Sequence, residues 1–132
     1  MIQSKIAETI SAWVENALTL PFTIFYDLIP NEDEDEDGAC IRHDPTPAAE
    51  KRFIDGTREV SWNFTFYTRC KDAENAREYG KKIVDTLDGA TIESTENIKI
   101  DCEAVTLPQF IDTDAKGFTT YAESVKCTFL EE

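Results

Sequence analysis

The feature that most constrains this fold is an alternation of large apolar and polar side chains. On one side of the pattern stand Val60, Trp62, Phe64 and Phe66, and between them lie Ser61, Asn63, Thr65 and Tyr67. A period of two with aromatic and β-branched residues predicts a β-strand with one buried face. Asp55-Gly56 precedes it, and this dipeptide is typical of tight hairpin turns. We therefore expect a hairpin over 51–69 whose long strand lies near the middle of a sheet.

Two amphipathic helices are expected to cover the apolar face of that strand. Apolar residues at spacings of three and four predict a first helix from about Ile2 to Leu18. A second helix is predicted from an N-cap at Asp72 to Leu87, and Gly89 stands just past its end. Gly80 inside this helix costs up to ~1 kcal/mol relative to Ala. A close approach to the sheet beneath would explain a residue without Cβ there.

The rest of the chain predicts further strands and two loop excursions. The expected strands are Phe22–Asp27, a short edge strand Ala39–His43, Ile98–Ala104 and a long last strand Phe118–Leu130. Residues 31–38 and 106–118 are expected as loops, the second being irregular around Pro108. The 132 residues fit one domain. The prediction is an α+β fold, a mostly antiparallel sheet with two helices packed on one face.

Charge and composition limit the partners that this chain can bind. The net charge is −14, which disfavours binding to nucleic-acid phosphates or to an anionic membrane surface. No apolar run approaches the ~20 residues of a membrane span, and Met1 leads directly into the amphipathic pattern rather than a leader peptide. Four cysteines without a CxxC pair indicate reduced cytoplasmic thiols.

An acidic run, NEDEDED, occupies positions 31–37. Six consecutive like charges repel one another, so we expect a solvated loop. The run also partly matches an EF-hand calcium loop, because acids alternate, Gly38 follows and an acid stands at the twelfth place. The flanking Pro30 and Pro45 oppose the helices that such a loop needs. The candidate calcium ligands are Asp33, Asp35, Asp37 and Asp44.

Other chemistry has little support in the sequence. Cys40 and His43 have a C-x2-H spacing, and zinc would need Cys70 and Cys102 to join them from elsewhere. Cys102 and Cys127 fall in the apolar registers of their strands, so core thiols are expected. His43 is the only histidine, and the chain has no phosphate loop, GxGxxG or HExxH motif. We therefore expect no catalytic residues, no cofactor and no enzymatic activity.

The order of elements is similar to that of small neck and tail proteins of long-tailed bacteriophages. The segments that carry the likeness are the first helix, FIDGTREVSWNFTFYTR ending at Arg69, the helix from Asp72 to Leu87, and the closing GFTTYAESVKCTFLEE with Tyr121. Together they cover nearly the whole chain. It resembles in particular the tail terminator group, often labelled minor capsid protein. The acidic run is not part of the likeness.

This resemblance implies a virion protein that is made in the bacterial host cytoplasm. It would form a homo-oligomeric ring, a hexamer, that caps the tail tube, ends its elongation and joins it to the head connector. An acidic lumen would repel the DNA that passes through. Glu123 breaks the apolar face of the last strand, which suggests a bulge or an interface position. The candidate lumen or interaction residues are Glu32, Asp33, Glu34, Asp35, Glu36, Asp37 and Glu123.

Two other functions remain open from the sequence. The first is an acidic monomeric binding module, such as a DNA mimic that occupies a nucleic-acid-binding protein. Crowding of six acids in one short loop, rather than their spread over a surface, weakens that reading. The second is a small enzyme or metal-binding protein, which the scarcity of motifs disfavours. Self-association separates a ring protein from a mimic.

Overall fold

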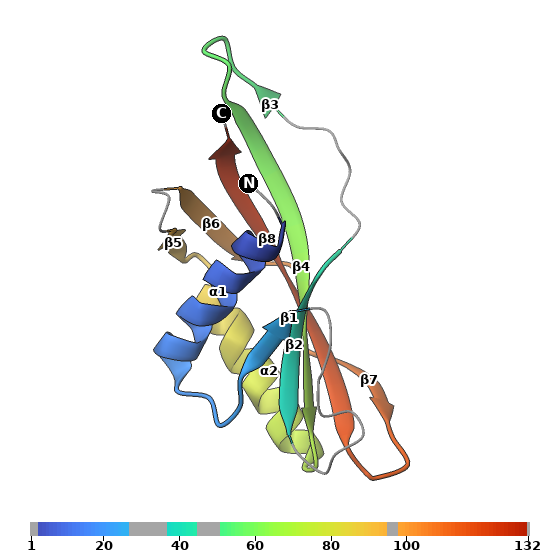
Figure 1. The fold of residues 1–132 in the computed structure, drawn as a ribbon. Helices are drawn as coiled ribbons and strands as arrows, with labels where there is room; N and C mark the ends of the chain where they lie inside the picture. The colour runs from blue at the N-terminus through green and yellow to red at the C-terminus, as the bar shows by residue number, and fades with distance from the viewer. Residues whose placement is uncertain (1–2, 27–36, 45–50, 95–97, 132) are drawn as a thin grey trace.

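The computed structural model describes residues 3–26, 37–44, 51–94 and 98–131. Within them the chain forms two helices and a mostly antiparallel sheet, which confirms the predicted α+β class. Figure 1 shows both helices against one face of a twisted sheet. In chain order the elements are α1 (Gln3–Leu18), β1 (Ile24–Tyr26), β2 (Gly38–His43), β3 (Lys51–Arg52), β4 (Arg58–Cys70), α2 (Ala73–Leu87), β5 (Thr91–Glu93), β6 (Lys99–Ala104), β7 (Gln109–Thr113) and β8 (Thr119–Glu131).

The sheet is built on the pairing of its two longest strands, β4 and β8. Each has 13 residues, and their antiparallel ladder runs without a register shift from the pair Arg58–Glu131 to the pair Cys70–Thr119. The predicted alternation is confirmed, because Val60, Phe64 and Phe66 are buried. A one-residue slip would send these side chains to the other face, so their burial fixes the register.

The other strands flank this pair on two sides. On the β4 side lie β3, β2 and β1, and on the β8 side lie β7, β6 and β5. The predicted edge strand Ala39–His43 is β2, but it is internal, because β1 pairs in parallel on its outer side. The sequence pattern could not predict this pairing, because β1 has only three residues and its partners in β2 lie 15 residues further along the chain.

The two helices match their predicted bounds closely. On α1, Ile6, Ile10 and Val14 are fully buried at the helical spacing of four. At the start of α2, the Asp72 carboxylate accepts a hydrogen bond from the Glu74 N–H at 2.9 Å, as an N-cap should. Among the described residues, no helix is long and apolar enough to cross a membrane.

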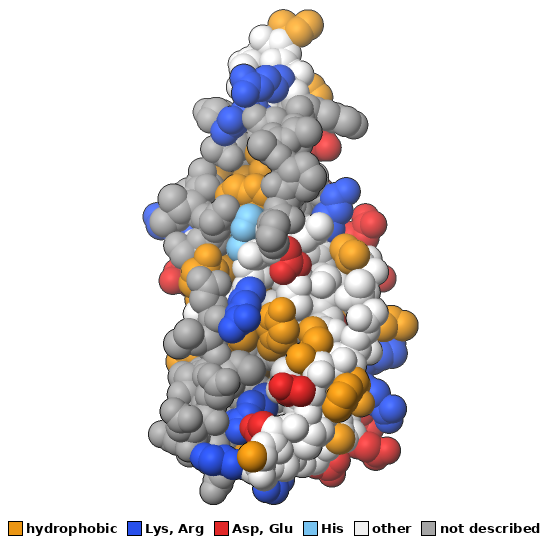
Figure 2. Space-filling model, turned by 90° about the vertical axis from the view of Figure 1, so that its right-hand side faces the viewer, with side chains coloured by type: hydrophobic (Ala, Val, Ile, Leu, Met, Phe, Trp, Pro, Cys, Tyr) orange, Lys and Arg blue, Asp and Glu red, His pale blue; other side chains and the backbone are white. Residues whose placement is uncertain are grey.

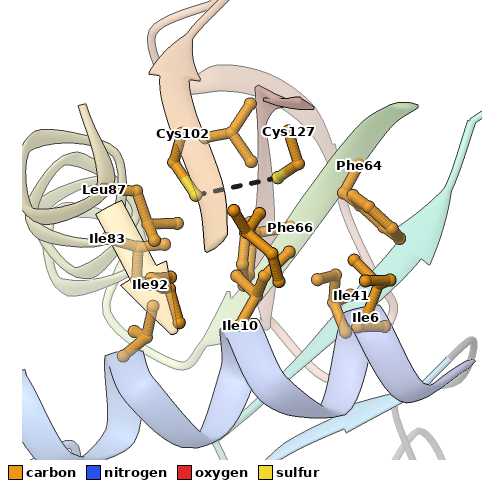
Figure 3. Close-up of a cluster of buried hydrophobic side chains, with 14 of the residues drawn as sticks. Ile6, Ile10, Ile41, Phe64, Phe66, Ile83, Leu87, Ile92, Cys102 and Cys127 are labelled. Carbon is orange, nitrogen blue, oxygen red and sulfur yellow. Dashed lines mark hydrogen bonds between the residues drawn. The ribbon is translucent and has the colours of Figure 1, made fainter. Parts of the chain in front are cut away.

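The core lies between the helices and the sheet (Figure 3). Ile10 of α1 lies next to Phe66 at the centre of β4, with Ile83 and Leu87 of α2 on one side of it and Ile6 of α1, below Phe64, on the other. All six side chains are fully buried. Truncation of such side chains typically costs 2–5 kcal/mol, so this contact holds both helices to the sheet.

Two strands were not predicted. The segment expected to be irregular around Pro108 contains β7, an edge strand beside β8, and β5 pairs with β6. In β7 all five residues are exposed, and its two apolar residues, Phe110 and Ile111, are adjacent rather than alternating with polar ones. Backbone pairing with β8 alone makes it a strand, and that pairing carries no local sequence pattern.

Candidate assembly surface

The acidic residues predicted as a calcium site are not brought together. Positions 32–36, including Asp33 and Asp35, lie outside the described residues. Asp37 and Asp44 stand at opposite ends of the extended strand β2, roughly 20 Å apart at about 3.3 Å per residue. The Asp37 Oδ1 accepts the Lys71 N–H at 2.9 Å, and the Asp44 Oδ2 accepts the Thr65 hydroxyl at 2.5 Å. One calcium ion cannot contact both carboxylates, so Asp37 and Asp44 do not belong to one EF-hand site.

The zinc hypothesis fails for a similar reason. Cys40 and His43 lie three residues apart on β2, and side chains at an odd spacing on a strand point to opposite faces. His43 packs edge-on against Trp62 and Phe64, with ring centroids 5.2 Å apart in both cases. Among the described residues, no group of three or more His, Cys, Asp or Glu side chains is arranged to hold a metal ion.

All four cysteines are free thiols buried in the fold. The Sγ atoms of Cys102 and Cys127 lie 3.8 Å apart across β6 and β8, as Figure 3 shows. Burial raises the pKa of Cys70 to about 12, and the Cys102 thiol together with burial raises that of Cys127. Thiols with raised pKa values are poor nucleophiles, which agrees with a core role.

Glu123 is not on the surface and not in a bulge, so that prediction is wrong. It stands opposite Phe66 in the regular β4–β8 ladder and has no exposed area. Its Oε1 accepts a hydrogen bond from the Thr68 hydroxyl at 3.0 Å, and its Oε2 has no hydrogen-bond partner among the described residues. Burial raises the pKa of Glu123 to about 8, because an ionised carboxylate loses its hydration there.

Arg69, which the sequence analysis named only as the end of the long aromatic strand, holds the β7–β8 turn. Its guanidinium is 3% exposed, donates to the Asp114 Oδ2 at 2.7 Å and lies 4.0 Å from the ring centre of Phe118. The hydrogen bond from Arg69 lowers the pKa of Asp114. The Asp114 Oδ1 accepts the N–H groups of Lys116 and Phe118 at 3.0 and 2.9 Å. These contacts fix the turn, and with it β7, to the end of β4.

Exposed apolar side chains gather at the two outer edges of the sheet. On the β8 side they are Phe110 and Ile111 of β7, with Val105 and Leu107 just before it. On the β4 side they are Phe25 and Tyr26 of β1. Within the described residues, β1 pairs only with β2 and β7 only with β8. Edge strands of this kind are templates for pairing with another chain.

A groove adjoins the β8-side edge. It has a volume of about 290 Å³ and is lined by Arg77, Glu78 and Lys81 of α2 and by Leu107 and Pro108. Beside it, the Phe110 ring packs edge-on against Tyr121 with centroids 6.0 Å apart. The groove and β7 therefore form one continuous surface of mixed apolar and charged character.

Comparison with known proteins gives a likeness of fold only. No protein-family model and no curated protein matches the chain. Sixteen chains of solved structures do match. One of them, whose title states no function, superposes with a TM-score of 0.58 at 12% identity and covers 96% of this chain and 92% of its own. At 12% identity this similarity shows a shared fold and gives no information on the function of this chain.

Proposed function

We propose that this chain is a structural protein of the tail or neck of a long-tailed bacteriophage. In this role it forms a ring that caps the tail tube, ends its elongation and joins it to the head connector. The observation that carries the proposal is the pair of apolar edges on opposite sides of one sheet. Two different surfaces that fit each other give a head-to-tail contact, and such contacts close into rings when the rotation allows.

The strand directions support such a contact. β1 runs parallel to β2, and β2 runs antiparallel to β4, so β1 and β4 run in opposite directions. β7 and β4 are both antiparallel to β8, so they share one direction. The β1 edge of one copy would therefore meet the β7 edge of the next as an antiparallel pair. Antiparallel pairs have the better hydrogen-bond geometry.

Electrostatics support the same role. A net charge of −14 on each copy gives a ring that repels DNA, as a channel for DNA passage requires. The proposed partners are further copies of the chain, the tail tube protein and the head connector protein. We propose no enzymatic step and no resident cofactor.

The test is the solution mass, followed by a capping assay. Six copies of the 15.0 kDa chain would have a mass of about 90 kDa by light scattering. Added to polymerising tail tubes, the protein should stop elongation at one end, as seen by electron microscopy. A chain that stays monomeric and leaves tube growth unchanged would contradict the proposal. If that monomer bound a DNA-binding protein in competition with DNA, the DNA-mimic alternative would replace it.

A further inference from the structure

The β3–β4 hairpin is an arm that projects beyond the rest of the sheet (Figure 1). Its tip exposes Phe53 and Ile54, and the Ile54 side chain makes so little contact that its relative exposure is 108%. A wholly exposed isoleucine contributes nothing to the stability of the fold. Its burial against a partner would contribute about 25 cal/mol for each Å² of apolar surface removed from water. Phe53 and Ile54 together give the arm an apolar tip of the kind that serves as the anchor of a contact with another molecule.

The arm has a defined shape. The Phe53 carbonyl accepts the Gly56 N–H at 3.1 Å, and the Phe53 N–H donates to the Thr57 carbonyl at 2.9 Å. The Asp55 Oδ1 accepts from the Thr57 N–H and hydroxyl at 3.0 and 2.7 Å. Gly56 has a φ of +91°, which L side chains rarely adopt. A turn fixed by these bonds loses little entropy when it binds.

The arm also carries the opposite charge to the rest of the chain. Segment 51–58, KRFIDGTR, has three basic residues and one acid, a net charge of +2. The remaining residues then sum to −16, because −14 minus +2 is −16. Figure 2 shows basic side chains just below the apolar tip. Of the basic residues, Arg52 is exposed and Arg58 is half-buried.

An acidic surface lies around β5 and β6, at the other edge of the sheet from this arm. The arm extends from the β4 side, and β5 and β6 form the outer strands of the β8 side. Around β5 and β6, four carboxylates (Asp88, Glu93, Asp101 and Glu103) and two bases (Lys99 and Lys126) are exposed. Lys99 stands opposite Glu93 and Lys126 opposite Glu103, so the surface keeps a net negative charge. Two of these carboxylates are held in place, since Asp101 accepts the Thr91 hydroxyl at 2.8 Å and Asp88 accepts the Ala104 N–H at 2.9 Å.

We propose that the hairpin arm docks on the acidic β5–β6 surface of a second copy of this chain. Ile54 is the apolar anchor, and Arg52 and Arg58 face Asp101 and Glu103 of the neighbour. This contact continues the proposed β1–β7 edge contact, because both join the β4 side of one copy to the β8 side of the next. The inference rests on the proposed function in this one respect, that the copies associate head to tail.

The first test is photo-crosslinking from the arm. A benzoylphenylalanine at position 54 should crosslink to a second copy, on the peptide that contains Asp101 and Glu103. Ile54→Asp should weaken self-association at least about tenfold, as loss of an interface anchor does, while Ile54→Leu keeps it. Crosslinks that stay within one chain, or that go to added DNA or to vesicles, would overturn the inference.

The second test is a charge swap within one chain. Arg52→Glu with Arg58→Glu should reduce association, and adding Asp101→Lys with Glu103→Lys should restore it, because every contact is then reversed on both sides. The matched control combines Lys5→Glu on α1 and Lys82→Glu on α2, both exposed and away from the two edges, with Asp101→Lys and Glu103→Lys. It has the same net charge and should not restore association. Equal behaviour of the two combinations would overturn the arm contact.

The outcomes separate the arm contact from the ring. If the wild-type chain forms a ring and the arm variants form it equally well, the arm inference fails and the proposed function stands. If position 54 crosslinks to β6 of a second copy but the mass indicates open chains rather than a closed ring, the arm contact stands and the ring fails. Circular dichroism of each variant shows whether the fold is kept.

Discussion

Gly80 of α2 lies directly against the buried carboxyl group of Glu123. A Cβ built on Gly80 would stand 2.5 Å from Oε2 and 2.8 Å from Cδ of Glu123. Gly80 has no positive φ, so close approach rather than backbone freedom accounts for the glycine. The helix therefore approaches the sheet closely at the point where the Glu123 side chain occupies the core face of β8.

Gly80→Ala should destabilise the protein by about 1–3 kcal/mol, the usual cost of overpacking. Alanine gains up to about 1 kcal/mol in helix propensity, but its Cβ forces the enclosed carboxyl group to move and strains the Thr68 hydrogen bond. Urea denaturation measures the change in the free energy of unfolding. In the double variant Gly80→Ala, Glu123→Ala, the alanine at 80 should cost less than it does alone. Additive effects would show that the two positions do not conflict.

Glu123 should make the protein less stable as the pH rises. Its folded-state pKa of about 8 exceeds the ordinary value of 4.5, so the folded state keeps a proton that the unfolded state has lost. The stability that Glu123 contributes is fully present below about pH 4.5. It is lost as the pH rises to about 8, at up to about 1.4 kcal/mol per unit.

Glu123→Gln should remove this dependence, because an amide does not ionise. Urea denaturation at pH 5, 7 and 9 gives the difference in unfolding free energy between the variant and the wild type. We expect the two proteins to be similar at pH 5 and the variant to be the more stable at pH 9. A difference that stays constant across this range would contradict the buried, protonated carboxyl.

Asp114→Ala should destabilise the protein clearly more than the loss of an exposed ion pair does. The change removes the carboxylate that faces Arg69, whose guanidinium is almost fully buried, and a buried charge that loses its partner is costly. The matched control is Asp85→Ala, which removes an exposed ion pair with Lys81 at 2.8 Å and should cost at most about 0.5 kcal/mol. Thermal denaturation compares the two. Equal losses would show that the Arg69 pair is no more than a surface contact.

Much of the fold could be predicted from the sequence because its main elements have strong local patterns. The alternation through Phe64 and Phe66 marks β4, and Asp72 marks the start of α2. The glycine at 80 indicated a close contact with the sheet, which the structure confirms. In each case a local feature of the sequence, such as an alternation, a capping residue or a missing Cβ, is enough to predict the element or contact.

What could not be predicted depends on contacts between distant segments. β7 has no alternation, and its strand conformation comes from pairing with β8. Glu123 was expected at a bulge or an interface, because burial of an ionised carboxylate is costly. Burial of the protonated carboxyl group costs much less, and no sequence pattern shows that Glu123 is protonated in the fold. Arg69 lies 45 residues from Asp114, and no spacing rule connects them. The β5–β6 acids likewise became one surface only through the sheet order.

The two sheet edges give the sharpest prediction about assembly. Phe25→Lys places a charge on the β1 edge, and Ile111→Lys places one on the β7 edge. Both positions are exposed, at 42% and 50%, so the fold should be kept. Each variant alone should be monomeric by light scattering, because a lysine on an edge strand opposes pairing.

A mixture of the two variants should behave differently. The Phe25→Lys protein keeps an intact β7 edge, and the Ile111→Lys protein keeps an intact β1 edge. In a head-to-tail arrangement these two edges can still pair once, which gives a heterodimer of about 30 kDa, twice 15.0 kDa, and no larger species. If like edges paired instead, β1 with β1 or β7 with β7, one variant alone would form a homodimer and mixing would add nothing. The mass of the mixture against each variant alone therefore decides which edges meet.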